Sequence, residues 1–297
     1  MTHPLVPLLA VHIADGVLAR DWVIGGWVVA AGLMFWAAWR IRDEEIPRVA
    51  LLTAAFFVAS LVHVPMGPTS AHLLLNGLVG VVLGRRALLA IPIGLFLQAV
   101  LIGHGGLTSL GVNSCIMGLP ALLAWGLFSC IRRLPWLRSP AFGTALVAGS
   151  TVIWVLSLVY SLTLLVANWG NTLEHPDIDL ANHWTFAPLT LAAALLVGIM
   201  MAALQRRLRQ TREFPLGLLI GEITVLATAL LNCMALMWGG QENWDALAIA
   251  VFIVHLPIAV IEGVVLGFTL GFLVQVKPEM VHWREPEEAA CVAESVS

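Results

Sequence analysis

Long apolar runs alternate with short polar segments along this chain, and the alternation predicts a bundle of membrane-crossing helices. A helix needs about 20 apolar residues to cross the hydrocarbon core of a bilayer, and eight or nine segments approach that requirement. The third and fourth are short and joined by Gly84-Arg85-Arg86, so we expect them to be tilted or partly buried. The segments cover residues 22–39, 49–63, 71–84, 87–102, 115–131, 141–168, 186–204, 215–238 and 246–276.

The fold class expected from this pattern is all-α: a polytopic transmembrane bundle of about seven core helices plus two extra helices. Residues 1–282 form one transmembrane domain in this prediction, and residues 1–20 form an external metal-binding segment at its amino end. Residues 169–240 carry no motif that we can match and are a possible two-helix insertion. Residues 283–297 are an acidic cytoplasmic tail.

The basic residues orient the bundle, because Lys and Arg accumulate in short cytoplasmic loops. With nine spans and an external amino terminus, only Arg20 lies outside, and the carboxyl terminus is cytoplasmic. The expected location is the cell inner (plasma) membrane. Six histidines then fall in external loops: His12, His63, His72, His104, His175 and His183. The basic residues on the cytoplasmic side are Arg40, Arg42, Arg48, Arg85, Arg86, Arg132, Arg133, Arg138, Arg206, Arg207, Arg209, Arg212, Lys277 and Arg284.

Composition excludes several classes of function. Hydrophobic residues make up 60% of the chain and charged residues 11%, against about a quarter charged in an ordinary soluble domain. The single lysine, Lys277, precedes a proline, so the chain has no Gly-Lys-Ser/Thr phosphate-binding loop. His-Glu-x-x-His and Gly-x-Ser-x-Gly motifs are absent as well. We therefore expect a chain that is not an enzyme and has no nucleic-acid partner.

Two polar segments carry histidines beside the apolar runs. They are Val11-His12-Ile13-Ala14-Asp15-Gly16 and Pro68-Thr69-Ser70-Ala71-His72. Imidazole is the commonest protein ligand of transition metals, so a metal is the first hypothesis. Hydroxyl side chains cap helices, and Thr69 and Ser70 therefore predict a helix that begins near His72. A third segment, Gly103 to Asn113, is rich in glycine and long enough to dip back into the protein.

These segments resemble the CbiM/NikM family, the substrate-capture membrane components of energy-coupling-factor cobalt and nickel importers. The resemblance rests on His12-Ile13-Ala14-Asp15-Gly16, on the run from His63 to Leu73, and on Gly105 to Asn113. Residues His255 to Gly263 also resemble the last helix of that family. The resemblance implies a separate transmembrane coupling subunit and cytoplasmic ATPase subunits in further chains. It also implies transported Ni(II) or Co(II) in place of a permanently bound cofactor.

The resemblance also implies a ligand set. In the family the chain begins Met-His, so the terminal amine, the next backbone nitrogen and the histidine side chain chelate one metal. His12 and His72 are the ligands implied here, with His63 and His104 as further candidates. Asp15 is expected to orient a ligand and Asn113 to brace the glycine-rich loop, while Ser70 supports the segment before His72.

This chain departs from the family pattern because His12 is internal. Three explanations are open. Translation starts at position 11, or a leader is cleaved after Ala10, or the removal of Met1 leaves Thr2-His3 and makes His3 the chelating residue. We favour a start or cleavage at position 11.

Polar and small residues within the spans suggest further roles. Gly26 and Ala30 form a small-xxx-small face on the first span, which either docks the coupling subunit or packs internally. Ionisable groups inside a membrane are costly and suggest function. For Glu262 we expect interhelical hydrogen bonding or partner docking. An alternative function is a stand-alone proton-coupled metal permease that uses Glu222, His255 and Glu262. A weaker alternative is a membrane enzyme with a bound metal.

Overall fold

The computed structural model of this chain describes most of its residues. The backbone is described for residues 9–10, 12–61, 63–66, 69–131, 133–134, 139–167, 188–208 and 213–281. His3, His175, His183 and the acidic tail lie outside the described residues. Helices dominate the described part, and each of the predicted apolar segments contains one. They are α1 (Arg20–Ala38), α2 (Ile46–Leu61), α3 (Asn76–Leu83), α4 (Ala87–Ile102), α5 (Leu110–Ile131), α6 (Pro140–Ala167), α7 (Pro188–Leu208), α8 (Glu213–Gly239) and α9 (Asp245–Val276).

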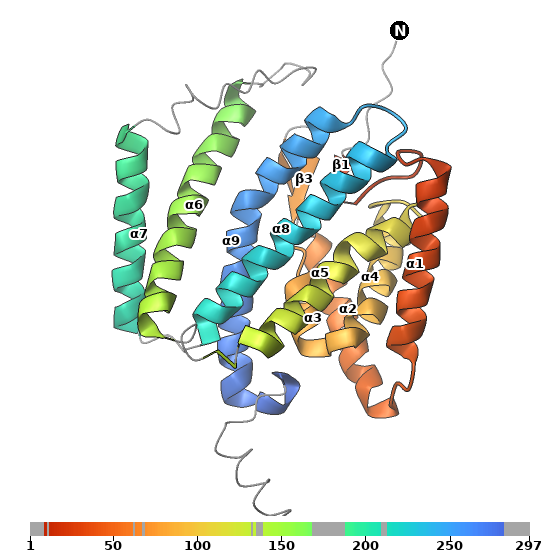
Figure 1. The fold of residues 1–297 in the computed structure, drawn as a ribbon, viewed down its shortest axis with the longest axis horizontal. Helices are drawn as coiled ribbons and strands as arrows, with labels where there is room; N and C mark the ends of the chain where they lie inside the picture. The colour runs from red at the N-terminus through yellow and green to blue at the C-terminus, as the bar shows by residue number, and fades with distance from the viewer. Residues whose placement is uncertain are drawn as a thin grey trace, which may run out of the picture.

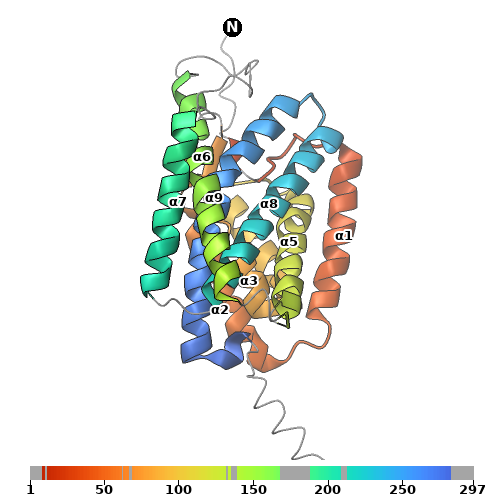
Figure 2. The same ribbon diagram turned by 60° about the vertical axis from the view of Figure 1, so that its left-hand side comes forward.

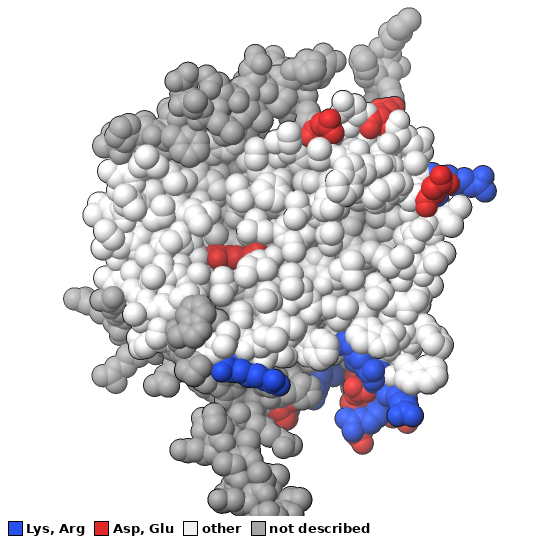
Figure 3. Space-filling model, in the orientation of Figure 1, with Lys and Arg blue, Asp and Glu red and all other residues white. Residues whose placement is uncertain are grey.

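Six candidate membrane spans are long and apolar enough to cross a bilayer, among the residues that the structure describes. One of them joins α3 and α4 as Asn76–Ile102. Large apolar side chains such as Val28, Leu196 and Phe272 are exposed around the bundle. Figure 3 shows a broad belt between two charged ends, and the belt is uncharged apart from an acidic side chain near its middle. Such a belt is expected where lipid surrounds the helices. The chain is a multi-pass membrane protein.

The centre of the bundle is the crossing of α8 and α9, which lies between the outer pair α6 and α7 and the group α1 to α5 (Figures 1 and 2). Glycines allow the two backbones to touch. A Cβ atom on Gly221 would lie 2.5 Å from the Cα atom of Gly263, and one on Gly217 would lie 2.5 Å from that of Gly267. Since α8 is largely buried and α7 lies at the edge of the bundle, the two helices of residues 169–240 have different environments. The insertion itself stays a prediction.

The third and fourth segments reverse direction between them. Gly84 has a positive φ of 57° and ends α3, and a short 3-10 turn at Gly84–Arg86 leads into α4. Arg86 donates hydrogen bonds to the carbonyl oxygens of Ala37, Trp39 and Arg40 at the end of α1, and its guanidinium pairs with Glu45 at 2.9 Å. α3 thus leads the chain away from the end of the bundle that contains β3, and α4 leads it back toward that end.

A small sheet, which the sequence analysis did not predict, lies beside these helices. It comprises β1 (Leu9–Ala10), β2 (His63–Met66) and β3 (Thr69–His72), in the order β1-β3-β2. β3 pairs antiparallel with β2 and parallel with β1. The expected helix start near His72 is therefore wrong. Backbone pairing holds residues 69–72 extended, and α3 begins only at Asn76.

Candidate metal centre

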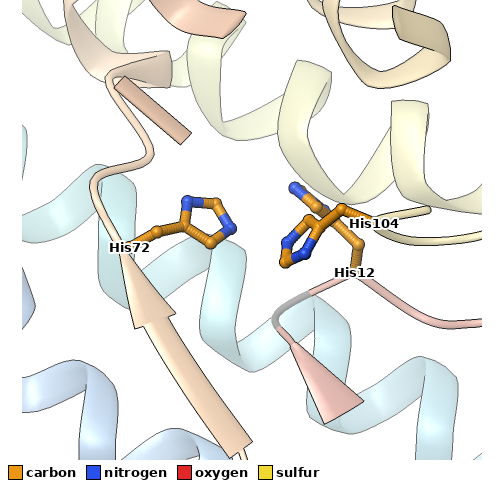
Figure 4. Close-up of side chains that lie close together, drawn as sticks. All are labelled: His12, His72 and His104. Carbon is orange, nitrogen blue, oxygen red and sulfur yellow. The ribbon is translucent and has the colours of Figure 1, made fainter. Parts of the chain in front are cut away.

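Three histidines meet in the upper half of the bundle, close to β3 (Figure 4). The ring centroids of His12 and His72 lie 5.1 Å apart, those of His12 and His104 lie 5.0 Å apart, and those of His72 and His104 lie 5.1 Å apart. One ring nitrogen from each residue can be chosen so that all three lie within 4.8 Å of one another. His12 and His72 are 2% and 4% exposed. The cluster is therefore an enclosed group of nitrogen donors.

Each imidazole comes from a different part of the chain. His12 precedes α1, His72 ends β3, and His104 lies in the connection from α4 to α5. Gly103 and Gly105 on either side of His104 have positive φ values of 63° and 83°, a conformation that glycine adopts at little cost. A Cβ atom on Gly105 would approach the Cβ atom of His12 to 3.1 Å. The glycines thus let the loop backbone come close to His12.

The amide of Asn113 fixes the His12 segment. The backbone nitrogen of Ile13 donates to Oδ1 of Asn113 at 3.0 Å, and Nδ2 of Asn113 donates to the carbonyl oxygen of Ile13 at 2.9 Å. Ser109 donates to the same carbonyl through its hydroxyl group. Asn113 lies in the first turn of α5, so the start of that helix sets the position of the residue next to His12.

Asp15 in turn holds the glycine-rich loop. Its carboxylate accepts hydrogen bonds from the backbone nitrogens of Leu107, Thr108 and Ser109 and from the Thr108 hydroxyl, at 2.6–3.1 Å. Burial alone would raise the pKa of Asp15, but these hydrogen bonds outweigh it and hold the pKa below its usual value. Asp15 therefore contacts the loop that follows His104, and Asn113 contacts both the segment that carries His12 and the loop residue Ser109. The predicted roles of Asp15 and Asn113 at a metal site stay predictions.

His72 is positioned through the residues that follow it. Glu262 on α9 is 4% exposed, and its carboxylate accepts hydrogen bonds from the backbone nitrogens of Leu74 and Leu75. Leu75 has a positive φ of 47°, which leads the chain from the sheet into α3. Nδ1 of His72 lies 2.9 Å from the carbonyl oxygen of Leu73. A proton on Nδ1 satisfies that contact and leaves the lone pair on Nε2.

The surroundings of His12 favour its neutral imidazole. Burial, followed by the neighbouring imidazoles of His72 and His104, holds the pKa of His12 well below its ordinary value. The side chain of Gln98 acts in the opposite direction and raises this pKa. Neutral imidazole is the form that binds metals, so His12 keeps its metal-binding form at acidity where an exposed histidine is protonated.

Other predicted residues lie elsewhere or are only partly described. The backbone of His63 pairs with that of His72 in the sheet, and Ser70 pairs with Ala10 and Pro65, while the side chains of His63 and Ser70 lie outside the described part. His104 was one of several candidates from the sequence. Its place between two glycines was the available signal, because that pattern marks a loop that approaches another backbone closely.

The small face of α1, for which docking of the coupling subunit and internal packing were both open, is covered by α5. A Cβ atom on Gly26 would lie 2.8 Å from the backbone nitrogen of Val112 on α5, and Ala30 is 3% exposed. Gly111 on α5 meets Trp27 equally closely. Glu262 is also buried. Gly26, Ala30 and Glu262 therefore hold the bundle together, and internal packing, the second alternative for this face, is what the structure shows.

Comparison with protein families gives one match that extends over nearly the whole described chain. The sequence model of CbiM, described as the cobalt uptake substrate-specific transmembrane region, matches residues 12–201 and 181–280. The matched region begins at His12 and contains His72, His104 and Glu262.

Individual relatives agree in name. A protein of Haemophilus influenzae, provisionally named a metal transport protein, is 42% identical over 113 residues, which are 38% of this chain and 55% of that protein. The cobalt transport protein CbiM of Thermosynechococcus vestitus is 33% identical over 137 residues, 43% of this chain and 53% of that one. The chain spans about half the length of these relatives. A crystal structure of a transition metal transporter is 20% identical with a TM-score of 0.49, and the match covers 89% of this chain and 93% of that one.

Proposed function

Because this chain belongs to the CbiM family, we propose that it is the substrate-binding membrane component of an ATP-driven cobalt or nickel importer of the energy-coupling-factor type. The observation that supports this most directly is the convergence of His12, His72 and His104. Three segments far apart in the sequence bring two buried imidazoles and the half-buried imidazole of His104 together at one end of a membrane bundle. The captured cation is cargo, and it enters from the external face.

The donor set suits a first-row divalent cation. Imidazole nitrogen binds Ni(II), Co(II) and their neighbours well, and affinity rises from cobalt to nickel. Metal–nitrogen bonds of about 2.1 Å place two nitrogens on opposite sides of an ion about 4.2 Å apart. The largest separation of 4.8 Å in the cluster therefore needs to shrink by a few tenths of an ångström. Small movements of the loops that carry His12 and His104 supply that contraction.

Further nitrogen donors would come from the amino end. If the mature chain begins at position 11, the terminal amine and the backbone nitrogen of His12 add two donors beside its side chain. Nitrogen donors in a near-planar set suit Ni(II) and the related Co(II) ion. Amino-terminal sequencing of the purified, metal-binding protein tests this proposal. An intact Met1 on fully active protein would rule it out.

Metal binding by purified protein tests the site. We expect one tightly bound Ni(II) or Co(II) per chain in the unaltered protein, and a loss of affinity of about 10-fold or more in His12→Ala, His72→Ala and His104→Ala. Asn243→Ala, in the exposed α8–α9 connection, serves as the matched control and keeps the original affinity. Unchanged binding in all three histidine variants would rule out this site.

Coupling to ATP is tested separately. The chain has no phosphate-binding loop of its own, so uptake into vesicles is expected only when coupling and ATPase subunits are present with ATP. Uptake by this chain alone, driven by a proton gradient, would support the permease alternative instead. The hydrogen bonds of Glu262 with Leu74 and Leu75 argue against that alternative, because they give this carboxylate a structural role.

A further inference from the structure

A fourth buried histidine lies outside the three-histidine cluster. His255 on α9 is 0% exposed, and its Nδ1 lies 2.5 Å from the carbonyl oxygen of Val251. A carbonyl oxygen only accepts hydrogen bonds, so Nδ1 carries the proton and Nε2 carries the lone pair. Nε2 is buried and has no hydrogen-bond partner. A histidine whose Nδ1 is held by a backbone carbonyl while Nε2 stays open has the arrangement of a metal ligand.

Two contacts, one from α9 and one from the loop before it, hold the part of α9 that carries His255 beside the segments of His12 and His72. Glu262 follows it by seven residues and lies on the same face of α9, about 10.5 Å further along the helix. Glu262 binds the backbone of Leu74 and Leu75, just after His72. At the other end, the α8–α9 connection binds the segment just after His12 through Gln241 and Val17. His255 lies between these contacts along α9, and it is one of the neighbours that lower the pKa of His12.

The side chain of Gln98 on α4 is another buried polar group near the cluster. It is 0% exposed, and neither Oε1 nor Nε2 has a hydrogen-bond partner. Its backbone carbonyl accepts from the backbone nitrogen of His104 at 3.1 Å. Its side chain lies beside His12 and raises the pKa of that imidazole. Amide oxygens are ligands of divalent cations.

Buried polar atoms without partners are rare in folded proteins and destabilise them, so each such atom requires an explanation. Here an imidazole nitrogen and an amide oxygen are both left open beside a proposed cation site. We propose that Nε2 of His255 and the amide oxygen of Gln98 form an inner cation position, which receives a first-row divalent cation from the three-histidine cluster. The proposal rests on the proposed function, because the cluster supplies the cation. With two protein donors completed by water, the inner position binds more weakly than the cluster.

Cobalt titration of the full chain in lipid nanodiscs tests this position, with Co(II) alone as the probe and its visible absorption as the readout. His255→Asn is the main variant, because the asparagine amide can still donate to the Val251 carbonyl while the Nε2 donor is lost. Gln98→Leu removes the other ligand. Thr269→Val, on the same helix beyond Glu262, is the matched control. Thermal unfolding of each variant shows that it is folded, and His255→Gln replaces His255→Asn if that variant unfolds.

His72→Ala weakens the cluster and exposes the inner position to measurement. We expect His72→Ala to retain weak Co(II) binding, and His255→Asn or Gln98→Leu in that background to weaken it further by about 10-fold or more. Thr269→Val in that background leaves it unchanged. Equal Co(II) affinity and equal spectra with and without His255→Asn would overturn the inner position. Tight binding that survives His72→Ala would instead overturn the proposed cluster, so the two failures are distinguishable.

Discussion

The amide of Asn113 is the contact on which the position of His12 most depends. It both donates to and accepts from the backbone of Ile13, as a neighbouring β-strand would. Asn113→Asp keeps the shape and the acceptor but replaces the donor with a second oxygen, which faces the Ile13 carbonyl. We expect about 1–3 kcal/mol lower stability and about 10- to 100-fold weaker Ni(II) binding, measured by thermal unfolding and titration.

Asn243→Asp is the matched control for this change. Asn243 is exposed, and its side chain accepts a hydrogen bond only from the nearby backbone nitrogen of Asp245, a bond that an aspartate also accepts. Its stability and metal affinity should equal those of the unaltered protein. If Asn113→Asp behaved in the same way, the Ile13 contact would not determine the position of His12.

Asp15 makes the loop sensitive to acid. Its pKa lies below the ordinary value in the folded protein, so the carboxylate stabilises the fold above about pH 4, and this stabilisation is lost as the pH falls through the lowered pKa. Asp15→Asn removes the titrating group. We therefore expect the melting temperature of the unaltered protein to fall more steeply below pH 4 than that of Asp15→Asn. Parallel curves would contradict this role.

Sequence reasoning found the histidines but not the contacts that hold them. His12 and His72 stood out because each lies in a short polar segment beside an apolar run. The pairing of Asn113 with Ile13 spans 100 residues, and no local pattern encodes a contact of that range. The contacts of Asp15 with residues 107–109 lie equally far from it in the sequence and were not predicted either.

The crossing of α1 and α5 depends on glycine at two places. Gly26 meets Val112 so closely that an added methyl group has no space, whereas neighbouring Gly25 has no atom within 4 Å of its would-be Cβ. Gly26→Ala should therefore destabilise the protein by about 1–3 kcal/mol. Gly25→Ala, the matched control, should leave stability unchanged or raise it slightly. Thermal unfolding measures both, and equal melting temperatures would contradict the close packing.

The α3–α4 turn is anchored by one guanidinium. Arg86 is buried and binds three carbonyl oxygens and Glu45, while neighbouring Arg85 makes one hydrogen bond, to the carbonyl of Trp39. Lysine lacks the forked geometry that reaches several acceptors. We expect Arg86→Lys to lower stability by about 2 kcal/mol and Arg85→Lys to have little effect. A smaller loss in Arg86→Lys than in Arg85→Lys would contradict this anchor.

Helices were predictable from the sequence, but the sheet was not. Apolar runs about as long as a bilayer is thick predict spans, and the end of α4 at Ile102 was predicted to the residue. In sequence, residues 69–72 resemble the cap of a helix. Thr and Ser, however, occur both in helix caps and in β-strands. What decides between the two is backbone pairing with β2, and with Leu9–Ala10 wherever the chain retains those residues.

The two ends of the bundle differ in their content of basic side chains, and this difference predicts the orientation of the bundle in the membrane. Blue side chains gather at the lower end in Figure 3, opposite the end that contains β3 in Figure 1. In a variant without native cysteines, Glu242→Cys should react with an impermeant maleimide on intact cells. Glu44→Cys should react only after lysis, because its loop faces the cytoplasm in the predicted topology. The reverse pattern would invert the topology.

The three imidazoles are held in position by contacts with different helices. His12 is fixed through α5, His72 through α9 and His104 by the end of α4. A cation bound by all three therefore reports the relative placement of those helices, since any shift among them changes the nitrogen separations. Coupling free energies are reciprocal. If a partner moves α9 relative to α5 and thereby lowers cation affinity by a given factor, a bound cation must weaken the binding of that partner by the same factor.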